Sequence, residues 1–403
     1  MRILMISEHF FPRIAGTSEY VHQTCLALSR IGQDIHLLVP GETDELVEIN
    51  DYPYRVTALG VGWNRKVDPD RSTRYQFATA TLQFAHKHLN HDRFDVVHVL
   101  FGSFVSEVFK TERFSNARIP CLQTVHNVPP AECRLSWTGD TLVNRFKDSL
   151  RLLLVTRKNR FRLRKTRFDC YIVPSNPVNQ LLASVLGIDA RIETISHGYN
   201  ESLAEHSEIP PSRAENTDNP IKVLTVGGWM PHKRQHLIPE IAHQLKESGI
   251  KFNWDIAGPN RKSAKYRDAV LAKIEALDLK ENVNVLGPVS KSELAQLYSN
   301  ANLYVQPSTE EGFCITALNA ASLGLPVIGC PTGALPELCK ISGGALVPSS
   351  SHDIADAIKH FLAAGLWNPT ALESAILTRE RYSWLNAANQ LIEVYRDLRP
   401  ITV

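Results

Sequence analysis

Two adjacent carboxylates, Glu310 and Glu311, precede a Gly-Phe step and an apolar segment of helical length in the stretch STEEGFCITALNAASLGLPVIG. A carboxylate accepts hydrogen bonds from sugar hydroxyls, and the amides at a helix start, here of Phe313 and Cys314, bind phosphate or sugar oxygens. Alternatively, acids near a helix start stabilise the helix by interacting with its dipole, but that role requires neither Gly312 nor a second acid. The sequence therefore predicts that this helix start binds an oxygen-rich ligand.

A second stretch, VGGWMPHKRQ, places Gly227 and Gly228 after a short apolar run, with Lys233 and Arg234 a few residues later. Small residues at the carboxyl end of a parallel strand let a ligand approach closely, and a helix start with a cation favours an anion. We expect both cations just inside the next helix, with Lys233 at the same sheet edge as Glu311. A diphosphate suits this place; the alternative is a solvated pair on an exposed helix.

Two histidines also follow short apolar runs, His126 in TVHN and His197 in ISHGYN. A single histidine is more often structural than functional, but the carboxyl end of a strand favours a role at a site. In the first turn, Gly16 stands where a nicotinamide-binding protein has Gly-x-Gly-x-x-Gly, which argues against that class. A helix is expected to begin there, capped by Thr17 or Ser18.

These residues need strands and helices to position them. Short apolar runs alternate with helical-length segments along the chain, which predicts an α/β fold of βα units on parallel sheets. With 403 residues the chain is too long for one core. We predict a domain over 1–200, a polar linker over 201–220 and a second domain over 221–383, both Rossmann-like and doubly wound.

Composition excludes several classes of protein. The net charge of +2 argues against a general nucleic-acid binder. Seven cysteines without a Cys-x-x-Cys pair argue against a disulfide framework and a thiolate zinc site, and favour a reducing, cytoplasmic location. The first apolar run ends too early for a signal peptide, and no stretch approaches the ~20 apolar residues of a membrane span. Asp68 and Asp70 indicate a solvated turn, so we predict no metal site.

The segment 145–167 contains ten Lys and Arg residues around a leucine-rich centre. Such a segment either lies on an anionic membrane surface at the inner face of a membrane or forms a solvated helix that buries its leucines.

Over nearly its whole length the chain resembles the retaining glycosyltransferases of family 4, which have the GT-B architecture of two facing Rossmann-like domains. The resemblance rests on the motifs quoted above, on the N-terminal stretch ILMISEHFFPRIAGTSEY, on PTGALPE and on RYSWLNAANQLIEVY. It implies that the last helix, 384–403, returns to the first domain. It also implies a nucleotide-sugar donor as co-substrate, a hydroxyl acceptor bound by loops near 60–74 and 129–140, and no cofactor or metal.

By this resemblance Lys233 neutralises the donor diphosphate, Glu311 holds hydroxyls of the donor sugar, and His126 contacts the transferred sugar. The loop at Gly16 approaches the phosphates. The resemblance also implies that the acceptor attacks from the side of the leaving group, so that retention needs no protein nucleophile. The other implied donor-binding residues are His197, Gly227, Gly228, Arg234, Glu310, Gly312, Phe313, Cys314, Ile315, Thr316 and Asn319.

Several positions depart from the family pattern. Asn319 stands where the second acid of Glu-x7-Glu holds the ribose hydroxyls, and Gly228 replaces an arginine for which Arg234 is a candidate substitute. Cys314 replaces a glycine, and Ala15 stands where Gly16 usually has a glycine neighbour. These departures leave two alternatives open: a phosphate-dependent sugar phosphorylase of the same fold, and a non-catalytic nucleotide-sugar-binding subunit.

Overall fold

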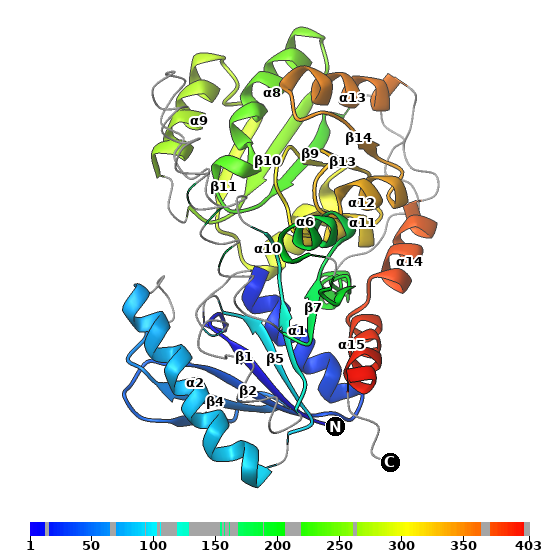
Figure 1. The fold of residues 1–403 in the computed structure, drawn as a ribbon. Coiled ribbons are helices and arrows are strands. Elements are labelled where there is room, and N and C mark those ends of the chain that lie inside the picture. Colours follow the sequence, from blue (N-terminus) through cyan, green and yellow to red (C-terminus); the bar gives the residue numbers. More distant parts are fainter. Residues whose placement is uncertain are drawn as a thin grey trace. The chain divides into compact units, whose positions relative to one another are not determined.

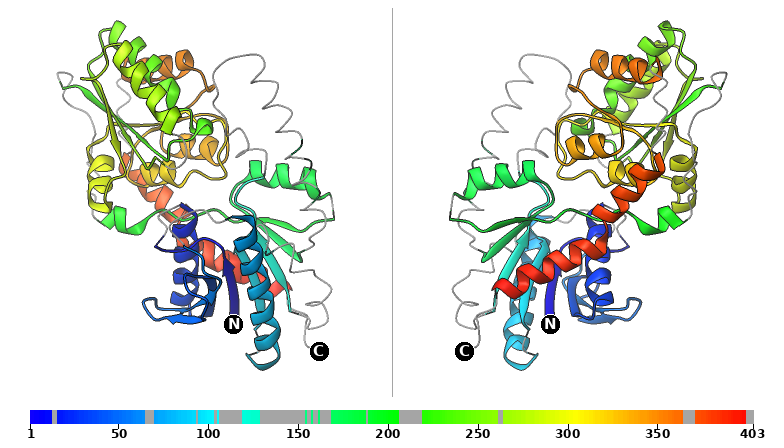
Figure 2. Two further views of the ribbon diagram at one scale, coloured as in Figure 1. Left: turned by 90° about the vertical axis from the view of Figure 1, so that its left-hand side faces the viewer. Right: turned by 90° about the vertical axis from the view of Figure 1, so that its right-hand side faces the viewer.

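The computed structural model describes residues 1–12, 16–64, 70–92, 94–102, 105, 119–128, 154, 157, 161, 168–187, 189–205, 219–260, 264–363 and 371–398. The chain divides into two compact units (Figures 1 and 2). The first unit consists of Met1–Val128, Arg157–His197 and Ser383–Val403, and the second of Pro129–Thr156 and Gly198–Tyr382. Each is described by itself.

The first unit contains a sheet of eight strands in the order β3-β4-β2-β1-β5-β6-β7-β8. All its neighbouring strands are parallel except β3 and β4. From β1 the chain builds outward to β2 on one side and to β5 on the other, so the strand order reverses between β1 and β5. Loops at the carboxyl ends diverge at such a point and leave room for a ligand. The strands are β1 (Arg2–Ser7), β2 (Asp34–Gly41), β3 (Val47–Ile49), β4 (Arg55–Gly60), β5 (Val96–Phe101), β6 (Cys121–Thr124), β7 (Cys170–Val173) and β8 (Ile192–Thr194).

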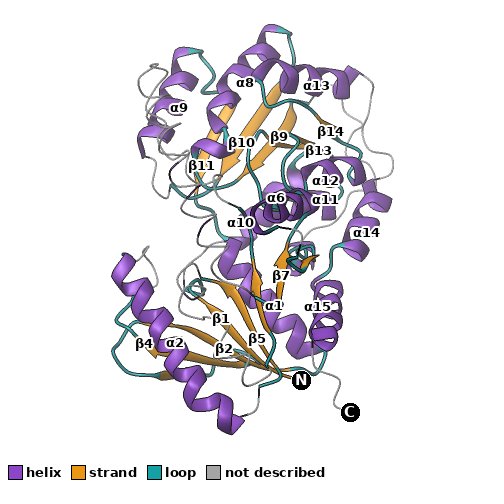
Figure 3. Ribbon diagram, in the orientation of Figure 1, coloured by secondary structure: helices purple, strands orange, loops and turns teal. Residues whose placement is uncertain are grey.

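Helices of this unit cover both faces of the sheet (Figure 3). Because successive side chains of a strand point to opposite faces, Ile3 and Met5 pack in one core and Leu4 and Ile6 in another. The first core includes residues of α1 and α15, which contact each other, and the second includes residues of α2 and α6. These helices are α1 (Gly16–Arg30), α2 (Arg71–Asp92), α6 (Asn176–Leu186) and α15 (Trp384–Leu398).

The second unit contains a parallel sheet of six strands in the order β11-β10-β9-β12-β13-β14. Its order reverses between β9 and β12, since the chain builds to β10 and β11 on one side and to β13 and β14 on the other. The strands are β9 (Ile221–Val226), β10 (Phe252–Ala257), β11 (Val283–Gly287), β12 (Leu303–Gln306), β13 (Val327–Gly329) and β14 (Ala345–Leu346). The helices are α7 (Glu201–Glu205), α8 (Ile238–Glu247), α9 (Ala264–Ala276), α10 (Lys291–Asn300), α11 (Ile315–Ser322), α12 (Leu335–Ile341), α13 (Ser351–Ala363) and α14 (Ala371–Arg381).

Three local expectations were wrong. Helix α1 begins at Gly16, so Thr17 and Ser18 lie within it and do not precede it as caps. Lys233 ends a short 3₁₀ turn, and α8 begins only at Ile238, because Arg234 adopts a left-handed conformation (φ 53°, ψ 33°) that interrupts helical geometry. The first five residues of the predicted linker form α7.

Helix α7 belongs to the second unit because it buries Leu203 in a core there, with Ala204 packed against the same core, and these apolar contacts stabilise the helix. In the part of the chain described, no helix combines the length and the apolar character that a membrane crossing requires.

Candidate functional site

An ion pair between Lys233 and Glu311 stands at the reversal point of the second sheet. Lys233 follows β9, Glu311 follows β12, and Lys233 Nζ lies 2.7 Å from both carboxylate oxygens. The Glu311 side chain is 7% exposed and that of Lys233 20%. Burial alone would raise the pKa of Glu311, but the adjacent ammonium and hydrogen bonds hold it below its usual value. The predicted neighbourhood of these two residues is therefore present, with Glu311 ionised.

A buried polar network lies behind Glu311 and was not predicted. Gln306, the last residue of β12, donates from Nε2 to Glu311 Oε1 (3.2 Å) and to Ser308 Oγ (2.6 Å). The backbone amide of Glu311 donates to Thr332 Oγ1 (3.0 Å). A side chain at Gly333 would meet Glu311 O at 2.7 Å, so this turn requires glycine. A glutamine at the end of the apolar run LYVQ was the signal in the sequence.

Helix α11 begins beside this carboxylate. Phe313 and Cys314 are buried, and Ile315 and Thr316 form its first turn. The first amides of a helix have no acceptor within the helix, so they are available donors for ligand oxygens. Burial, with a smaller contribution from the nearby Glu311, raises the pKa of the Cys314 thiol to about 12, so this cysteine is an uncharged group at neutral pH.

Backbone strain is concentrated at this site. Among the described residues, Arg234, Asp278 and Cys314 are the non-glycine residues with positive φ, and two of these three adjoin Lys233 and Glu311. The φ of Cys314 is 81°, a value that glycine adopts without steric cost. Strain of this kind persists only where the surrounding packing holds it, and it is enriched at functional sites.

Arg234, a predicted substitute for the missing diphosphate cation, contacts a loop in this structure. Its Nη1 donates to Ser349 O (2.7 Å) and Ser349 Oγ (3.0 Å). Contact of Arg234 with a donor therefore stays a prediction. Gly227 keeps the predicted open space, since a Cβ there would meet no atom within 4 Å. Gly228 accepts at its carbonyl from Gln235 Nε2 (3.0 Å).

Asn319 is buried in α11 and has protein partners. Its Oδ1 accepts from the backbone amide of Asn200 at 2.9 Å, and the Tyr298 hydroxyl forms a further hydrogen bond with its side chain. A ribose contact by this residue would have to share or displace these bonds. The position thus ties α11 to the segment that precedes α7.

In the first unit, the predicted histidines lie together at the carboxyl ends of the strands. The rings of His126 and His197 are 5.6 Å apart, and Tyr20 contacts both, at 4.5 and 4.6 Å. Burial lowers the pKa of His126 to about 4 and that of His197 well below its usual value, so both are neutral at pH 7. His126 Nε2 lies 3.0 Å from Leu100 O and must donate to it, which leaves Nδ1 as an acceptor.

Helix α15 supports this histidine pair. Trp384 stacks on His197 with 18° between the rings, and the Tyr395 hydroxyl lies 2.6 Å from Nδ1 of buried His98. The other ring nitrogen of His98 lies 2.9 Å from Thr124 Oγ1. At Gly16, the first residue of α1, a Cβ would meet nothing within 4 Å, so a ligand has room to approach there.

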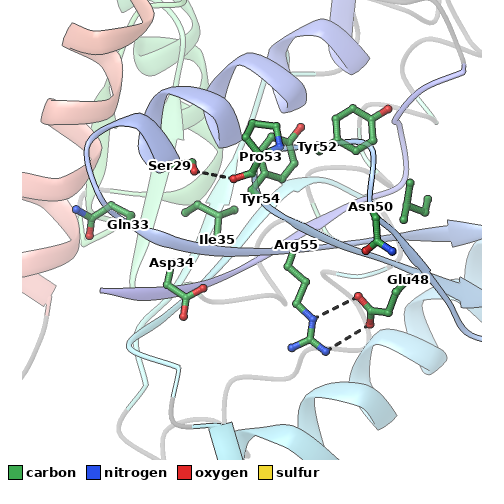
Figure 4. A pocket seen from close by; sticks show the side chains of 11 residues that line it. Ser29, Gln33, Asp34, Ile35, Glu48, Asn50, Tyr52, Pro53, Tyr54 and Arg55 are labelled. Carbon is green, nitrogen blue, oxygen red and sulfur yellow. Dashed lines mark hydrogen bonds and ion pairs between the residues drawn. The ribbon is translucent and has the colours of Figure 1, made fainter.

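A separate cavity of about 690 Å³ lies at the amino ends of β2 and β4, the opposite edge of the first sheet (Figure 4). Arg55 and Glu48 form an ion pair across it, and Ser29 donates to Pro53 O. It contains none of the predicted site residues. Its lining residues are Ser29, Gln33, Asp34, Ile35, Glu48, Ile49, Asn50, Tyr52, Pro53, Tyr54 and Arg55.

Several predictions fall on residues outside the described ranges. These include the acceptor loop 129–140 and, apart from residues 154, 157 and 161, the basic segment 145–167. Contact with a membrane and the acceptor loops stay predictions. Within the described residues, no group of three or more His, Cys, Asp or Glu side chains is placed to bind a metal ion.

Two family models match this chain, one in each half. Residues 14–203 match the family model described as Glycosyltransferase Family 4, and residues 208–371 match the model described as Glycosyl transferases group 1. An uncharacterized glycosyltransferase of Methanocaldococcus jannaschii is 23% identical over 98% of both chains. A D-inositol 3-phosphate glycosyltransferase of Mycobacterium tuberculosis is 28% identical over 57% of this chain and 48% of its own length.

Solved structures match over the full length. Sucrose-phosphate synthase of Thermosynechococcus elongatus superposes with a TM-score of 0.76 at 21% identity, covering 99% of each chain. HepE of Anabaena, solved with UDP and glucose, gives 0.69 at 18% identity, covering 98% of this chain and 100% of its own. These likenesses confirm the predicted GT-B fold.

Proposed function

We propose, from the premise that the chain belongs to glycosyltransferase family 4, that it transfers a sugar from a nucleotide-sugar donor to an acceptor hydroxyl with retention of anomeric configuration. The observation that carries this proposal is the partly buried pair of Lys233 and Glu311 beside the start of α11. It combines a cation for a diphosphate, a carboxylate for sugar hydroxyls and amide donors in one place.

Donor binding would change the contacts of Lys233 in this pair. Lys233 has three N–H donors, and a diphosphate carries more negative charge than the single carboxylate that now holds it. As the leaving diphosphate gains charge, Lys233 and the dipole of α11 would stabilise it, which is the role that a metal ion plays elsewhere. We therefore propose a transferase that needs no bound metal.

Glu311 is assigned to binding and not to nucleophilic attack. Both its oxygens face Lys233, and Oε1 also accepts from Gln306, so the carboxylate is held in one orientation. In the first unit, neutral His126 offers Nδ1 as an acceptor for a hydroxyl of the transferred sugar. Because the Glu311 carboxylate is engaged by Lys233 and Gln306 and His126 is neutral, we assign neither as a nucleophile and propose retention by attack from the face of the leaving group.

The ligands and names of similar proteins support the substrate classes. HepE was solved with UDP and glucose, and starch synthase IV of Arabidopsis thaliana with ADP and acarbose. The inositol phosphate transferases and sucrose-phosphate synthase are named for polar, hydroxyl-bearing acceptors or products. A nucleotide diphosphate sugar as donor and a polyhydroxylated acceptor are the substrates we propose.

The test measures nucleotide release without acceptor from UDP-glucose, GDP-mannose, ADP-glucose and dTDP-glucose, with and without EDTA. We expect slow release from one donor, unaffected by EDTA, lost in Glu311→Gln and retained in the control Glu373→Gln on α14. Release that requires a metal would overturn metal independence. Cleavage of a disaccharide only with inorganic phosphate would identify a phosphorylase, and binding without turnover over a broad acceptor panel would identify a binding subunit.

A further inference from the structure

Gln306 is a buried amide at the end of an otherwise apolar strand. It is 1% exposed, and both ends of its side chain have partners. Nε2 donates to Glu311 and Ser308, while Oε1 accepts from the Tyr304 hydroxyl at 2.7 Å. Burial of a polar amide opposes folding unless its hydrogen bonds are made, so its position beside the candidate carboxylate calls for an explanation.

The network has a direction. An ionised carboxylate only accepts, so the donating end of Gln306 must face Glu311 and its oxygen must face Tyr304. The Tyr304 hydroxyl also lies 2.9 Å from Thr316 Oγ1 in the first turn of α11 and 3.2 Å from Val226 O at the end of β9. One hydrogen-bond network therefore joins Glu311 to the strand before Lys233 and to the first turn of α11.

We propose that Gln306, oriented by Tyr304, is a positioning residue that keeps Glu311 aimed at the donor sugar when the donor diphosphate draws Lys233 away. The proposal rests on the proposed function. In the free protein Lys233 provides two short contacts to the carboxylate, Gln306 provides one at 3.2 Å, and the Ser308 side chain provides a further hydrogen bond. When Lys233 turns to the diphosphate, the bonds from Gln306 and from Ser308, whose hydroxyl accepts from the same Gln306 amide, remain.

This role predicts a selective effect on the sugar. A hydrogen bond to a charged group is worth roughly a factor of ten or more in an equilibrium constant. Its removal also disfavours the ionised form, so the pKa of Glu311 in the complex would rise. Other titratable groups beside this carboxylate are Lys233, His232 and the uncharged Cys314 thiol. Burial lowers the pKa of His232 to about 4, so His232 stays neutral at pH 5.5. Loss of Gln306 would therefore weaken binding of the nucleotide sugar more at pH 5.5 than at pH 8, and would leave binding of the nucleotide alone nearly unchanged.

The experiment compares calorimetric affinities for UDP-glucose and UDP, or for whichever donor and nucleotide the parent binds, at pH 8 and 5.5. The variant Gln306→Met keeps the length of the side chain and removes the amide. We expect about a tenfold loss for the nucleotide sugar at pH 8, a larger loss at pH 5.5, and less than a twofold change for the nucleotide. Tyr304→Phe should act in the same direction, and the double variant should lose less than the sum of both.

A matched control is Thr225→Val in β9. Thr225 Oγ1 donates to Val305 O (2.8 Å) and accepts from Trp254 Nε1 (3.1 Å), so this change removes buried hydrogen bonds of the same sheet without touching Glu311. If Gln306→Met lowers the affinities for nucleotide and for nucleotide sugar equally, as a general loss of packing would, the proposal is overturned. Unchanged affinities for both ligands would also overturn it. A parent that binds no nucleotide sugar would instead overturn the proposed function.

Should Gln306→Met fail to fold, Tyr304→Phe alone decides: a selective loss for the nucleotide sugar supports the proposal and an equal loss for both ligands overturns it.

Discussion

Replacement of Lys233 by Met should destabilise the second unit because it leaves Glu311 buried without its counter-ion. At 2.7 Å and an effective dielectric constant near 20, the attraction between the two charges is about 6 kcal/mol before desolvation is counted. Removal of one partner of a buried pair typically lowers the free energy of unfolding by about 3–5 kcal/mol. Since Lys233 is 20% exposed and Gln306 still donates to Glu311, we expect about 2–3 kcal/mol at pH 8.

The loss should depend on pH in a defined direction. In the parent, the lowered pKa of Glu311 contributes stability above the ordinary value near 4.3, and this contribution disappears as the pH falls through the folded-state pKa. Without Lys233, burial dominates and raises that pKa, so the folded variant binds a proton above pH 4.3 and regains stability as the pH falls. The difference between parent and variant should therefore shrink between pH 8 and pH 5.

Replacement of Glu311 should affect stability less than replacement of Lys233. Glu311→Gln should lower the free energy of unfolding by less, about 1 kcal/mol, because the longer and more exposed Lys233 side chain can reach water and the amide introduced at position 311 keeps a polar group in place. The double variant Lys233→Met with Glu311→Gln should recover most of the loss seen in Lys233→Met alone.

The assay is urea unfolding at pH 8 and pH 5, with hydrogen exchange of peptides from β9 and β12 to assign the transition to the second unit. Lys246→Met is the matched control, because its partner Asp278 is 98% exposed and such pairs contribute about 0–1 kcal/mol. A loss in Lys233→Met that is no larger than in Lys246→Met, and the same at both pH values, would refute the reasoning.

Two further predictions concern strain and titration. Cys314 has a left-handed backbone conformation, so Cys314→Gly should have a free energy of unfolding in urea about 1 kcal/mol higher than Cys314→Ala. In an ordinary helix position alanine is the more stable of the two, so equal stability of the variants would contradict strain at this residue. Burial lowers the pKa of His98 to about 3, against 6.5 unfolded, so its neutral form stabilises the first unit above pH 6.5 and about 2 kcal/mol is lost between pH 7 and pH 5. Because burial also lowers the pKa of His126 and His197, His98→Asn should reduce the stability lost between pH 7 and pH 5 by about 2 kcal/mol without abolishing it. The control His86→Asn, at an exposed position on α2, should leave the loss as it is in urea unfolding curves of the parent.

The sheets could be predicted from the sequence because buried parallel strands read as short continuous apolar runs. The run Ile3 to Ile6 lies within β1, and Leu303 to Val305 lies within β12. Helix starts were less predictable. Lys and Arg favour helices, so the left-handed Arg234, which delays α8 to Ile238, left no signal in composition.

Ligand-binding residues of parallel sheets lie at the carboxyl ends of the strands, and this principle predicted where the site residues lie but not what each one contacts. Lys233 and Glu311 are 78 positions apart in the chain, yet each follows a strand beside the reversal point, so topology alone brings them together. The bond between Asn200 and Asn319 spans 119 positions and depends on the packing of α7 and α11, which no local pattern encodes. The same holds for Gln306, whose role is visible only once Tyr304 and Glu311 are placed.

The departures from the family pattern remove one cation, because Gly228 stands in place of an arginine, and alter two positions at α11, while Lys233 and Glu311 are both present. At position 314, the φ of 81° explains why a glycine is usual, and burial of the cysteine side chain supports the same backbone conformation at a steric cost. At position 319, the amide oxygen accepts from the Asn200 amide, a bond that a carboxylate could also accept, and the side chain carries no charge. Donor recognition should therefore depend more on Lys233 and Glu311, and less on the ribose, than in relatives with two acids.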